Sequence, residues 1–321
     1  MKKKIKVAVL SGGISNERGV SLKTAAQIAK ALPKDKYQVS VLDIPKNENK
    51  ALKVLAKKLD PKKIDVAFIA LHGRFGEDGK IQGILDVLKI PYTGSGVLAS
   101  ALGMDKIQCS NILKNVGILI PEFLVLHNLQ EMNIQARELK EIIGFPCVVK
   151  PNESGSSIGV TIVKDPMKLK RAVQEAFHED KTVIVQKYIK GRELTCGVLG
   201  NNGRTELRAL PVIEIIAHDA EFFDYQTKYF SNTVEEICPA KINQKIAQRV
   251  QTLSKKIHET LGCDGLTRSD FILSKDNRLY FLEINTIPGQ TEASLCPKEA
   301  RAAGIPFGQF LEMQIELALV K

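Results

Sequence analysis

Two carboxylates in the last quarter of the sequence are spaced so that a hairpin would bring them together. The pattern there predicts two strands, Thr267–Ser274 and Arg278–Asn285, joined by a tight turn. If Asp276-Asn277 alone forms that turn, Asp270 lies directly opposite Glu283. Opposed carboxylates repel each other on a bare sheet, whereas a divalent cation held between them converts the repulsion into coordination.

The same register places two more polar side chains beside the carboxylates. Arg268 lies opposite Asn285, and because residues two apart on a strand share a face, all four groups point the same way. Carboxylates with an amide beside them are hard oxygen ligands that suit Mg²⁺ or Mn²⁺. A solvent-exposed face on which the acids tolerate each other is the alternative, although the apolar residues of the hairpin leave little of it for water. A slip of one residue in register would scatter the four groups.

Length and composition indicate a soluble enzyme with more than one domain. The chain has 321 residues, enough for two or three domains, of which 44% are hydrophobic and 26% charged. Its net charge of +10 is spread along the chain with few aromatics between the basic residues, which favours an anionic small substrate over nucleic acid, with plain solubility as the alternative. The cysteines form no CxxC pair and have no metal-ligand spacing, which predicts reduced thiols in a cytoplasmic protein. The apolar run near the N-terminus predicts a first strand and not a signal peptide, and no stretch is long enough to span a membrane.

The N-terminal part of the sequence alternates between strand and helix patterns. Buried strands are predicted at Ile5–Leu10, Gln38–Asp43 and Asp65–Ala70, and helices at Ser21–Leu32, Asn47–Leu59 and Gly79–Lys89. This alternation predicts a parallel sheet with helices on both faces, and such sheets bind ligands beyond the carboxyl ends of their strands. Two loops with charged residues beside glycines, Ser11–Ser21 and His72–Gly79, occupy that position. The GxGxxG fingerprint is absent, so NAD is not expected.

A glycine-serine loop in the middle of the chain is a candidate for binding phosphate. The segment PNESGSSIG follows the strand FPCVVK, and Gly155 and Gly159 let the backbone turn its amides toward an anion. Ser156 and Ser157 add hydroxyl donors, and Lys150 ends the preceding strand beside them. A plain hairpin loop is the alternative, but the flanking lysine supplies the charge that phosphate requires. No Walker A or protein-kinase motif occurs in the sequence.

Two later segments also suggest ligand contacts. The segment TVIVQKYIKGREL predicts a strand and a connector whose backbone could bind a purine, with Glu193 near the ribose hydroxyls, although a core strand would have the same pattern. Strands are then predicted at Leu194–Leu199 and Arg208–Ile216. The polar segment His218–Glu236 contains aromatics among Asp, Lys and Asn, which is typical of a lid or binding loop, with a disordered insert as the alternative. A helix is predicted at Asn243–Leu261.

Together these motifs resemble the D-alanine–D-alanine ligases of the ATP-grasp superfamily. The matching segments, in chain order, are GGISNERGVSL, ALHGRFGEDG, YTGSGVLASALGMDK, VVKPNESGSSIGV, KYF, GLTRSDF and LEINTIPGQTEASLCP. The resemblance covers essentially the whole chain and implies an ATP-grasp fold, α/β and α+β in class. It implies an N-terminal parallel α/β domain (1–105), a central ATP-grasp subdomain (106–193) and a C-terminal ATP-grasp subdomain (194–321). The implied reaction is ATP + 2 D-alanine → D-alanyl-D-alanine + ADP + phosphate, for peptidoglycan synthesis, in a cytoplasmic homodimer.

The resemblance also implies a role for each site residue. Two Mg²⁺ or Mn²⁺ ions are implied on Asp270, Glu283 and Asn285. The implied ATP-binding residues are Lys106, Lys150, Ser156, Ser157, Gln186, Lys187, Ile189, Glu193 and Lys228. The implied catalytic residues are Glu17, Ser156, Tyr229, Arg268 and Gly289, of which Arg268 and the Gly289 N–H face the developing oxyanion. The implied D-alanine-binding residues are Glu17, His72, Arg268, Ser294 and Leu295. Glu17 is also expected to bond Ser156 and Tyr229 when the site closes.

One position departs from the family pattern, and several alternatives stay open. Gln186 stands where a Glu is usual, so the bond to the exocyclic amine of adenine should be weaker, while recognition by the backbone of residues 187–189 should survive. A D-alanine–D-lactate or D-alanine–D-serine ligase is the nearest alternative, and Tyr229 favours the dipeptide. Another ATP-grasp carboxylate–amine ligase is less favoured, because Glu17, Tyr229 and Ser294 are expected to contact the amino acids and not ATP. A catalytically inactive binding module should have lost a metal ligand, and all three are present.

Overall fold

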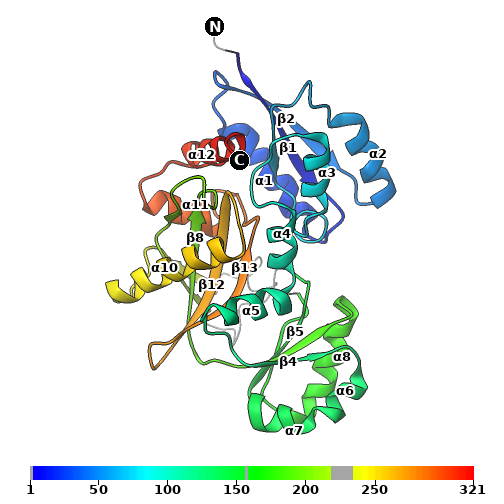
Figure 1. The fold of residues 1–321 in the computed structure, drawn as a ribbon, viewed down its shortest axis with the longest axis vertical. Coiled ribbons are helices and arrows are strands. Elements are labelled where there is room, and N and C mark those ends of the chain that lie inside the picture. The colour runs from blue at the N-terminus through cyan, green and yellow to red at the C-terminus, as the bar shows by residue number, and fades with distance from the viewer. Residues whose placement is uncertain (1–2, 156–157, 218–233) are drawn as a thin grey trace.

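The computed structural model of this chain describes residues 3–155, 158–217 and 234–321. The strands in these ranges form three sheets, and the third sheet lies between the first two along the length of the molecule (Figure 1). No helix in the same ranges is both long and apolar enough to cross a membrane.

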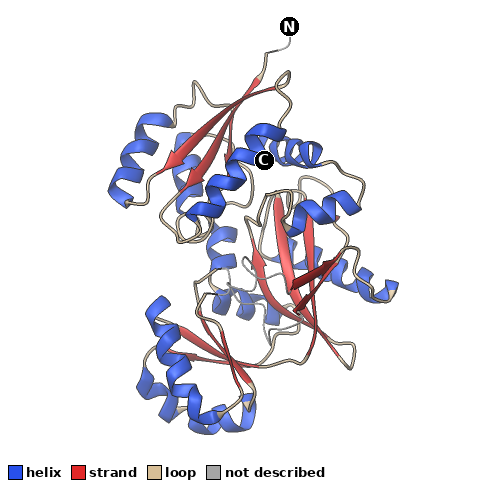
Figure 2. Ribbon diagram, turned by 180° about the vertical axis from the view of Figure 1, so that it is seen from behind, coloured by secondary structure: helices blue, strands red, loops and turns tan. Residues whose placement is uncertain are grey.

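The first sheet is parallel and carries helices on both faces, as predicted. Its strand order is β2-β1-β3, with both pairings parallel. The elements of this part are β1 (Ile5–Gly12), α1 (Arg18–Ala31), β2 (Tyr37–Ile44), α2 (Glu48–Lys58), β3 (Val66–Ile69) and α3 (Lys80–Leu88). Alternate residues of β1 belong to two cores: Ala8 and Leu10 pack with α2 and α3, whereas Val7 and Val9 pack with α1. Figure 2 shows the sheet between its two layers of helices.

The C-terminal helix returns to this first sheet. Helix α12 (Phe307–Leu319) contributes Leu311 and Ile315 to the same core as α1. An amphipathic helix fits many apolar surfaces, so the position of α12 on the N-terminal sheet is a result of the tertiary fold. The first and last parts of the chain therefore share one hydrophobic core.

The second sheet is antiparallel and has helices on one face. Its strand order is β4-β7-β5-β6, and its core includes Leu126, Val149, Val173 and Val185. The elements of this part are β4 (Phe123–Leu126), α6 (Leu129–Ile134), α7 (Ala136–Glu138), a π-helical turn (Leu139–Ile143), β5 (Cys147–Pro151), β6 (Thr161–Val163), a 3₁₀ turn (Pro166–Lys168), α8 (Leu169–Glu179) and β7 (Val183–Lys187).

The third sheet is antiparallel and has the order β11-β10-β8-β12-β13, with β9 paired to β8. Its strands are β8 (Gly191–Leu199), β9 (Arg208–Ala209), β10 (Ile213–Ala217), β11 (Val234–Ile237), β12 (Leu266–Ser274) and β13 (Leu279–Asn285). The helices packed on it include α4 (Val97–Met104), α5 (Lys106–Asn115), α10 (Gln244–Thr260) and α11 (Leu295–Ala302). The single strand predicted from Arg208 to Ile216 is wrong, because the chain leaves the sheet around Pro211, which has no N–H to give to a ladder.

The β12–β13 hairpin has the predicted pairing where the carboxylates lie. Asp270 pairs with Glu283, and Arg268 pairs with Asn285, so the four polar groups share one face of the hairpin. The register proposed from the sequence is confirmed at this end of the hairpin.

The turn of the same hairpin differs from the prediction. Ser274 pairs with Arg278 around a loop of three residues, in which Asn277 has a φ of 58°. The predicted two-residue turn is therefore wrong. From Phe271 onward the pairing is offset by one residue, which leaves Leu282 as the extra residue of a β-bulge. The bulge cancels the extra loop residue, so the carboxylates still face each other.

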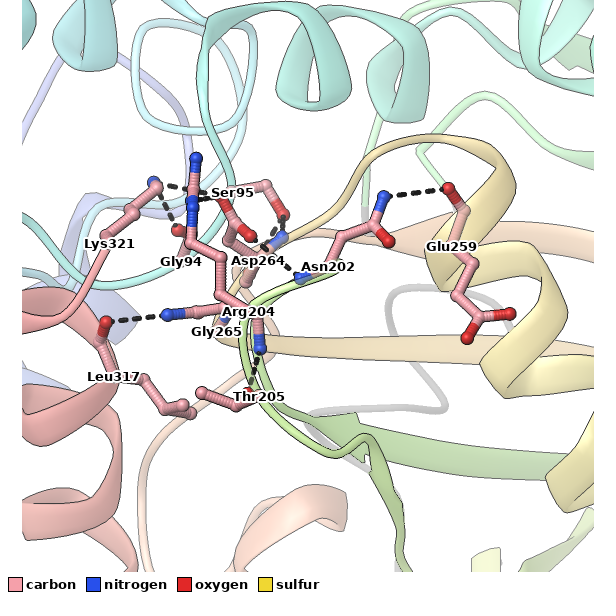
Figure 3. A network of polar contacts seen from close by, with 11 residues as sticks. Gly94, Ser95, Asn202, Arg204, Thr205, Glu259, Asp264, Gly265, Leu317 and Lys321 are labelled. Atoms are coloured by element: carbon pink, nitrogen blue, oxygen red, sulfur yellow. Dashed lines mark hydrogen bonds and ion pairs between the residues drawn. The ribbon is translucent and has the colours of Figure 1, made fainter.

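A polar network fixes the first sheet against the third (Figure 3). The Ser95 hydroxyl donates to the Asp264 carbonyl at 3.1 Å, and Lys321 Nζ donates to the Gly94 carbonyl at 2.9 Å. Gly265, with a φ of +68°, comes so close that a Cβ on it would lie 2.8 Å from the Gly94 nitrogen. The loop between α3 and α4 is thus held tightly against the start of β12.

Candidate active site

Two cavities meet at the β12–β13 hairpin. The first, of about 330 Å³, lies between the loops of the first sheet and the hairpin, and the second, of about 390 Å³, lies between the second and third sheets. Lys106, Ser154 and Glu283 line both cavities. Glu283 is therefore at the junction of two spaces that could hold two different ligands.

Arg268 and Asp270 form a buried ion pair on the face of the hairpin. Arg268 Nε and Nη2 donate to the two Asp270 carboxylate oxygens at 2.9 and 2.7 Å. From β8, the Thr195 hydroxyl donates to Asp270 Oδ1 at 2.5 Å. Burial alone would lower the pKa of Arg268, but the charge of Asp270 and the hydrogen bonds to it raise that pKa well above its ordinary value. Arg268 is thus a fixed positive charge that lines the first cavity, while Asp270 lines the second.

Glu283 and Asn285 complete the predicted metal-binding set. The Glu283 side chain is 38% exposed, and its Oε2 lies 3.7 Å from Lys106 Nζ. Asn285 Oδ1 accepts the Ile287 N–H at 2.8 Å, which orients the amide and leaves a second lone pair on the oxygen. Among the described residues no group of three or more His, Cys, Asp or Glu could hold a metal ion. The two carboxylates and the amide are hard oxygen donors that fit Mg²⁺ or Mn²⁺.

Lys106 ties the start of the glycine-serine loop to α5. Its Nζ donates to the Ser154 carbonyl at 2.7 Å. Asp105, the N-cap of α5, accepts a hydrogen bond from Asn152 Nδ2 at 3.0 Å and also accepts the Gln108 N–H. The helix start and the loop therefore hold each other in place beside both cavities.

Lys150 lies at the end of β5, buried beside the second cavity. Burial, reinforced by the charge of Lys106, lowers the pKa of Lys150 to about 8. A bound anion would restore the lost solvation and favour the charged form of this side chain.

The other described residues predicted to bind ATP also line the second cavity. They are Gln186, Lys187, Ile189 and Glu193, carried by the end of β7, the connector and the start of β8. The connector turns into β8, and Arg192 there pairs with Glu214 of β10 through bonds of 2.5 and 2.6 Å. Sequence reasoning missed both of these cavity-lining residues, because they lie on strands whose pairing is set only by the tertiary fold. A charged residue inside a predicted strand, Glu214, was the available signal.

The predicted amino-acid-binding residues line the first cavity. They are Glu17, His72, Arg268, Ser294 and Leu295, and Gly289, predicted as a catalytic residue, lines the same cavity. A Cβ on Gly289 would lie 2.9 Å from Ser294 Oγ, so the two residues are close neighbours in this cavity. The N-cap residue Ser294 is itself oriented by Thr291, whose N–H and hydroxyl lie 3.2 and 2.7 Å from Ser294 Oγ. Sequence reasoning missed Lys23, Glu77, Thr291 and Glu236, which also line this cavity.

Four predicted site residues lie outside the described residues: Ser156, Ser157, Lys228 and Tyr229. Their contacts, including those expected between Glu17, Ser156 and Tyr229, stay predictions. The lid expected at His218–Glu236 falls mostly in the same range.

Comparisons with known proteins agree along the whole chain. The D-ala D-ala ligase N-terminus profile matches residues 6–57 and 45–95, and the D-ala D-ala ligase C-terminus profile matches residues 112–316. The chain is 44% identical over 317 residues to a D-alanine–D-alanine ligase of Syntrophobacter fumaroxidans, with 98% of each chain covered. It is 43% identical over 321 residues to one of Desulfotalea psychrophila, covering 99% of this chain and 96% of the relative.

Solved structures give the same result. A D-alanine–D-alanine ligase from Bacillus anthracis complexed with ATP matches with a TM-score of 0.84 at 38% identity, covering 99% of this chain and 98% of the other. The VanG D-Ala:D-Ser ligase from Enterococcus faecalis matches with the same TM-score at 30% identity, covering 98% and 100%. These likenesses span both cavities and all three sheets. The chain belongs to the D-alanine–D-alanine ligase family and has its ATP-grasp fold.

Proposed function

We propose that this protein joins two D-alanine molecules to D-alanyl-D-alanine, with conversion of ATP to ADP and phosphate, for peptidoglycan precursor synthesis. The observation that carries the proposal is the meeting of two cavities at Glu283 and Lys106. The second cavity has the connector and the lysines expected for a nucleotide, and the first has the groups expected for two amino acids. A phosphoryl group bound at the junction is within reach of both.

The reaction follows from this arrangement. The carboxylate of the first D-alanine attacks the γ-phosphate of ATP, which releases ADP and forms an acylphosphate. The amine of the second D-alanine attacks the acylphosphate carbon, and the tetrahedral intermediate then expels phosphate. The protein makes no covalent bond, so positioning and charge neutralisation supply most of the acceleration.

Charge neutralisation is assigned to the hairpin and the lysines. Lys106 and Lys150 face the ATP phosphates, and Asp270, Glu283 and Asn285 would hold two Mg²⁺ or Mn²⁺ ions. The chemistry supplied by such ions is neutralisation of the phosphate charge during transfer.

Substrate positioning is assigned to the first cavity. Arg268 and the Gly289 N–H stabilise the developing oxyanion, and Glu17 pairs with the ammonium of the first D-alanine beside His72. Ser294 and the Leu295 N–H receive the carboxylate of the second D-alanine at the start of α11.

A competition experiment tests the substrate assignment. ADP release with D-alanine alone should be rapid, and chromatography of products made with equal D-alanine, D-serine and D-lactate near neutral pH should give mainly the D-alanine dipeptide. The D-serine arm is included because one neighbouring structure is a D-Ala:D-Ser ligase. If the main product instead joins D-alanine to D-serine or D-lactate, the assigned acceptor is wrong, while the assigned ATP chemistry still holds.

The proposal also includes the location, the oligomeric state and the domain limits of the protein. We expect a cytoplasmic homodimer formed through the N-terminal domain, and the domain limits 1–105, 106–193 and 194–321. Light scattering on the purified chain tests the dimer, because a monomeric mass at micromolar concentration would contradict it. Limited proteolysis tests the domain limits, because cleavage is expected first in exposed segments near them.

A further inference from the structure

A carboxylic acid outside the predicted site is buried behind it. The side chain of Glu299, on α11, is 0% exposed. Its Oε2 accepts the backbone N–H of Gly197 in β8 at 2.9 Å. Gly197 in turn pairs with Arg268 across the β8–β12 ladder. The carboxyl group therefore connects α11 to the strand beside the arginine of the first cavity.

Gly197 is shaped to receive this carboxyl group. A Cβ built on Gly197 would lie 2.5 Å from Glu299 Oε2, 2.9 Å from Leu210 Cδ1 and 3.3 Å from Cys296 Sγ. The space where other residues carry their side chain is thus filled by Glu299 and Cys296. A side chain on Gly197 would have to displace the side-chain ends of Glu299, Leu210 and Cys296, so the absence of a Cβ leaves room for the Glu299 carboxyl group.

The buried position changes the protonation of Glu299. Burial raises its pKa to about 8, although the positive charge of Arg268 acts in the opposite direction. The group is therefore mostly neutral near pH 7, and it serves as a hydrogen-bond acceptor rather than as a buried charge.

Glu299 lies one helical turn after the residues expected to bind the second D-alanine. Helix α11 begins at Leu295 with Ser294 as its N-cap, and residues four apart lie on the same side of a helix, about 6 Å apart along its axis. The bond to Gly197 thus anchors the face of α11 that carries Leu295. We propose that Glu299 is a positioning residue for the acceptor half of the reaction, because it holds Ser294 and Leu295 at a fixed place relative to Arg268. This inference rests on the proposed function.

Replacement of Glu299 separates the two halves of the reaction. Glu299→Ala leaves the Gly197 N–H without its acceptor and frees α11, so the Michaelis constant for the second D-alanine should rise roughly tenfold. The Michaelis constant for ATP and kcat should stay within about threefold, because neither the hairpin nor the second cavity loses a contact. Hydroxylamine captures an acylphosphate directly as a hydroxamate, so the rate of hydroxamate formation measures phosphorylation of the first D-alanine. That rate should be unchanged in Glu299→Ala. Glu299→Gln keeps a side-chain oxygen that can accept the Gly197 N–H. Its Michaelis constant for the second D-alanine should therefore lie within about twofold of wild type.

Two further variants complete the test. Ala302→Gln, on the exposed end of α11, is the matched control and should behave as wild type. Glu299→Asp keeps the acid but shortens it by one methylene, so it should raise the acceptor constant by about threefold even where the alanine variant does not fold. The positioning role is wrong if Glu299→Asp leaves the Michaelis constant for the second D-alanine unchanged. It is also wrong if the variants change both Michaelis constants, kcat and thermal stability in parallel and Glu299→Gln does not correct these changes. A wild-type enzyme that makes hydroxamate and no dipeptide would overturn the proposed function and the positioning role with it.

Discussion

Glu283 lies where a single charge should matter far more for turnover than for folding. Glu283→Gln keeps the shape of the side chain and removes one negative charge. The side chain is 38% exposed, and its nearest cation, Lys106 Nζ, is 3.7 Å away. Partly exposed pairs of this kind contribute about 0–1 kcal/mol to stability, so the free energy of unfolding should change by no more than that.

The expected effect on the reaction is larger. The carboxylate lies opposite Asp270 at the junction of the two cavities, where we assign the metal-bound phosphates. Loss of one electrostatic contact to a transferring group typically reduces kcat by at least about a hundredfold, which corresponds to about 2.7 kcal/mol. The barrier should therefore change by more than twice as much as the stability.

The assay is ADP release at saturating ATP, D-alanine and Mg²⁺, with thermal unfolding measured on the same samples. Glu122→Gln is the matched control, because it breaks an exposed pair with Lys114 at 3.2 Å that lines neither cavity. Turnover in Glu283→Gln within a few fold of wild type would refute the metal assignment. A drop in stability large enough to account for the lost activity would refute the separation of the two effects.

Three other outcomes follow from the structure. The pKa of Lys150 is lowered to about 8, so its charge is lost as pH rises through 8, and the affinity for a non-hydrolysable ATP analogue should fall about fivefold from pH 7 to 9 in wild type and less in Lys150→Met. Burial lowers the pKa of His258 to about 4, so between pH 6.5 and 4 the unfolded chain binds a proton that the folded chain does not. The stability that this group contributes is therefore present above pH 6.5, and the free energy of unfolding should fall by about 2 kcal/mol from pH 7 to 5. Urea unfolding of His258→Gln should show a weaker dependence of that free energy on pH. Gly265→Ala would place a Cβ 2.8 Å from Gly94 at a φ of +68°, and urea unfolding should show a loss of about 1–3 kcal/mol.

The N-terminal sheet could be predicted because its signals are local. Strands such as Ile5–Leu10 are uninterrupted apolar runs between helical patterns, as buried parallel strands usually are. The position of α12 on that sheet could not be predicted in the same way, because an amphipathic helix fits many apolar surfaces equally well. The break at Pro211 was readable, since proline inside a predicted strand argues against a continuous ladder.

The site residues fall into the same two groups. Glu17, His72 and Ser294 stand in motif segments, and the fold brings all three to the first cavity. The Arg192–Glu214 pair and the Glu299–Gly197 bond join residues from elements far apart in sequence, whose contacts depend on strand order and helix packing. A charged residue inside a predicted strand, such as Glu214, indicates that a partner exists, but a single sequence does not say which residue that partner is.

The bulge at Leu282 explains why the hairpin can serve two cavities. In a regular strand consecutive side chains point to opposite faces, yet Leu282 and Glu283 both line the second cavity. The spacing of the core side chains in β13 changes at the bulge. Leu279 and Phe281 are two residues apart, but the next core side chain, Ile284, follows three residues after Phe281. Because of that shift, a leucine lines the second cavity directly beside the carboxylate at its junction with the first cavity. A hairpin with the predicted two-residue turn and no bulge would pair the same carboxylates but turn Leu282 away from the second cavity. The irregularity therefore supplies an apolar wall to the cavity that we assign to the nucleotide, without moving the residues that we assign to the metal.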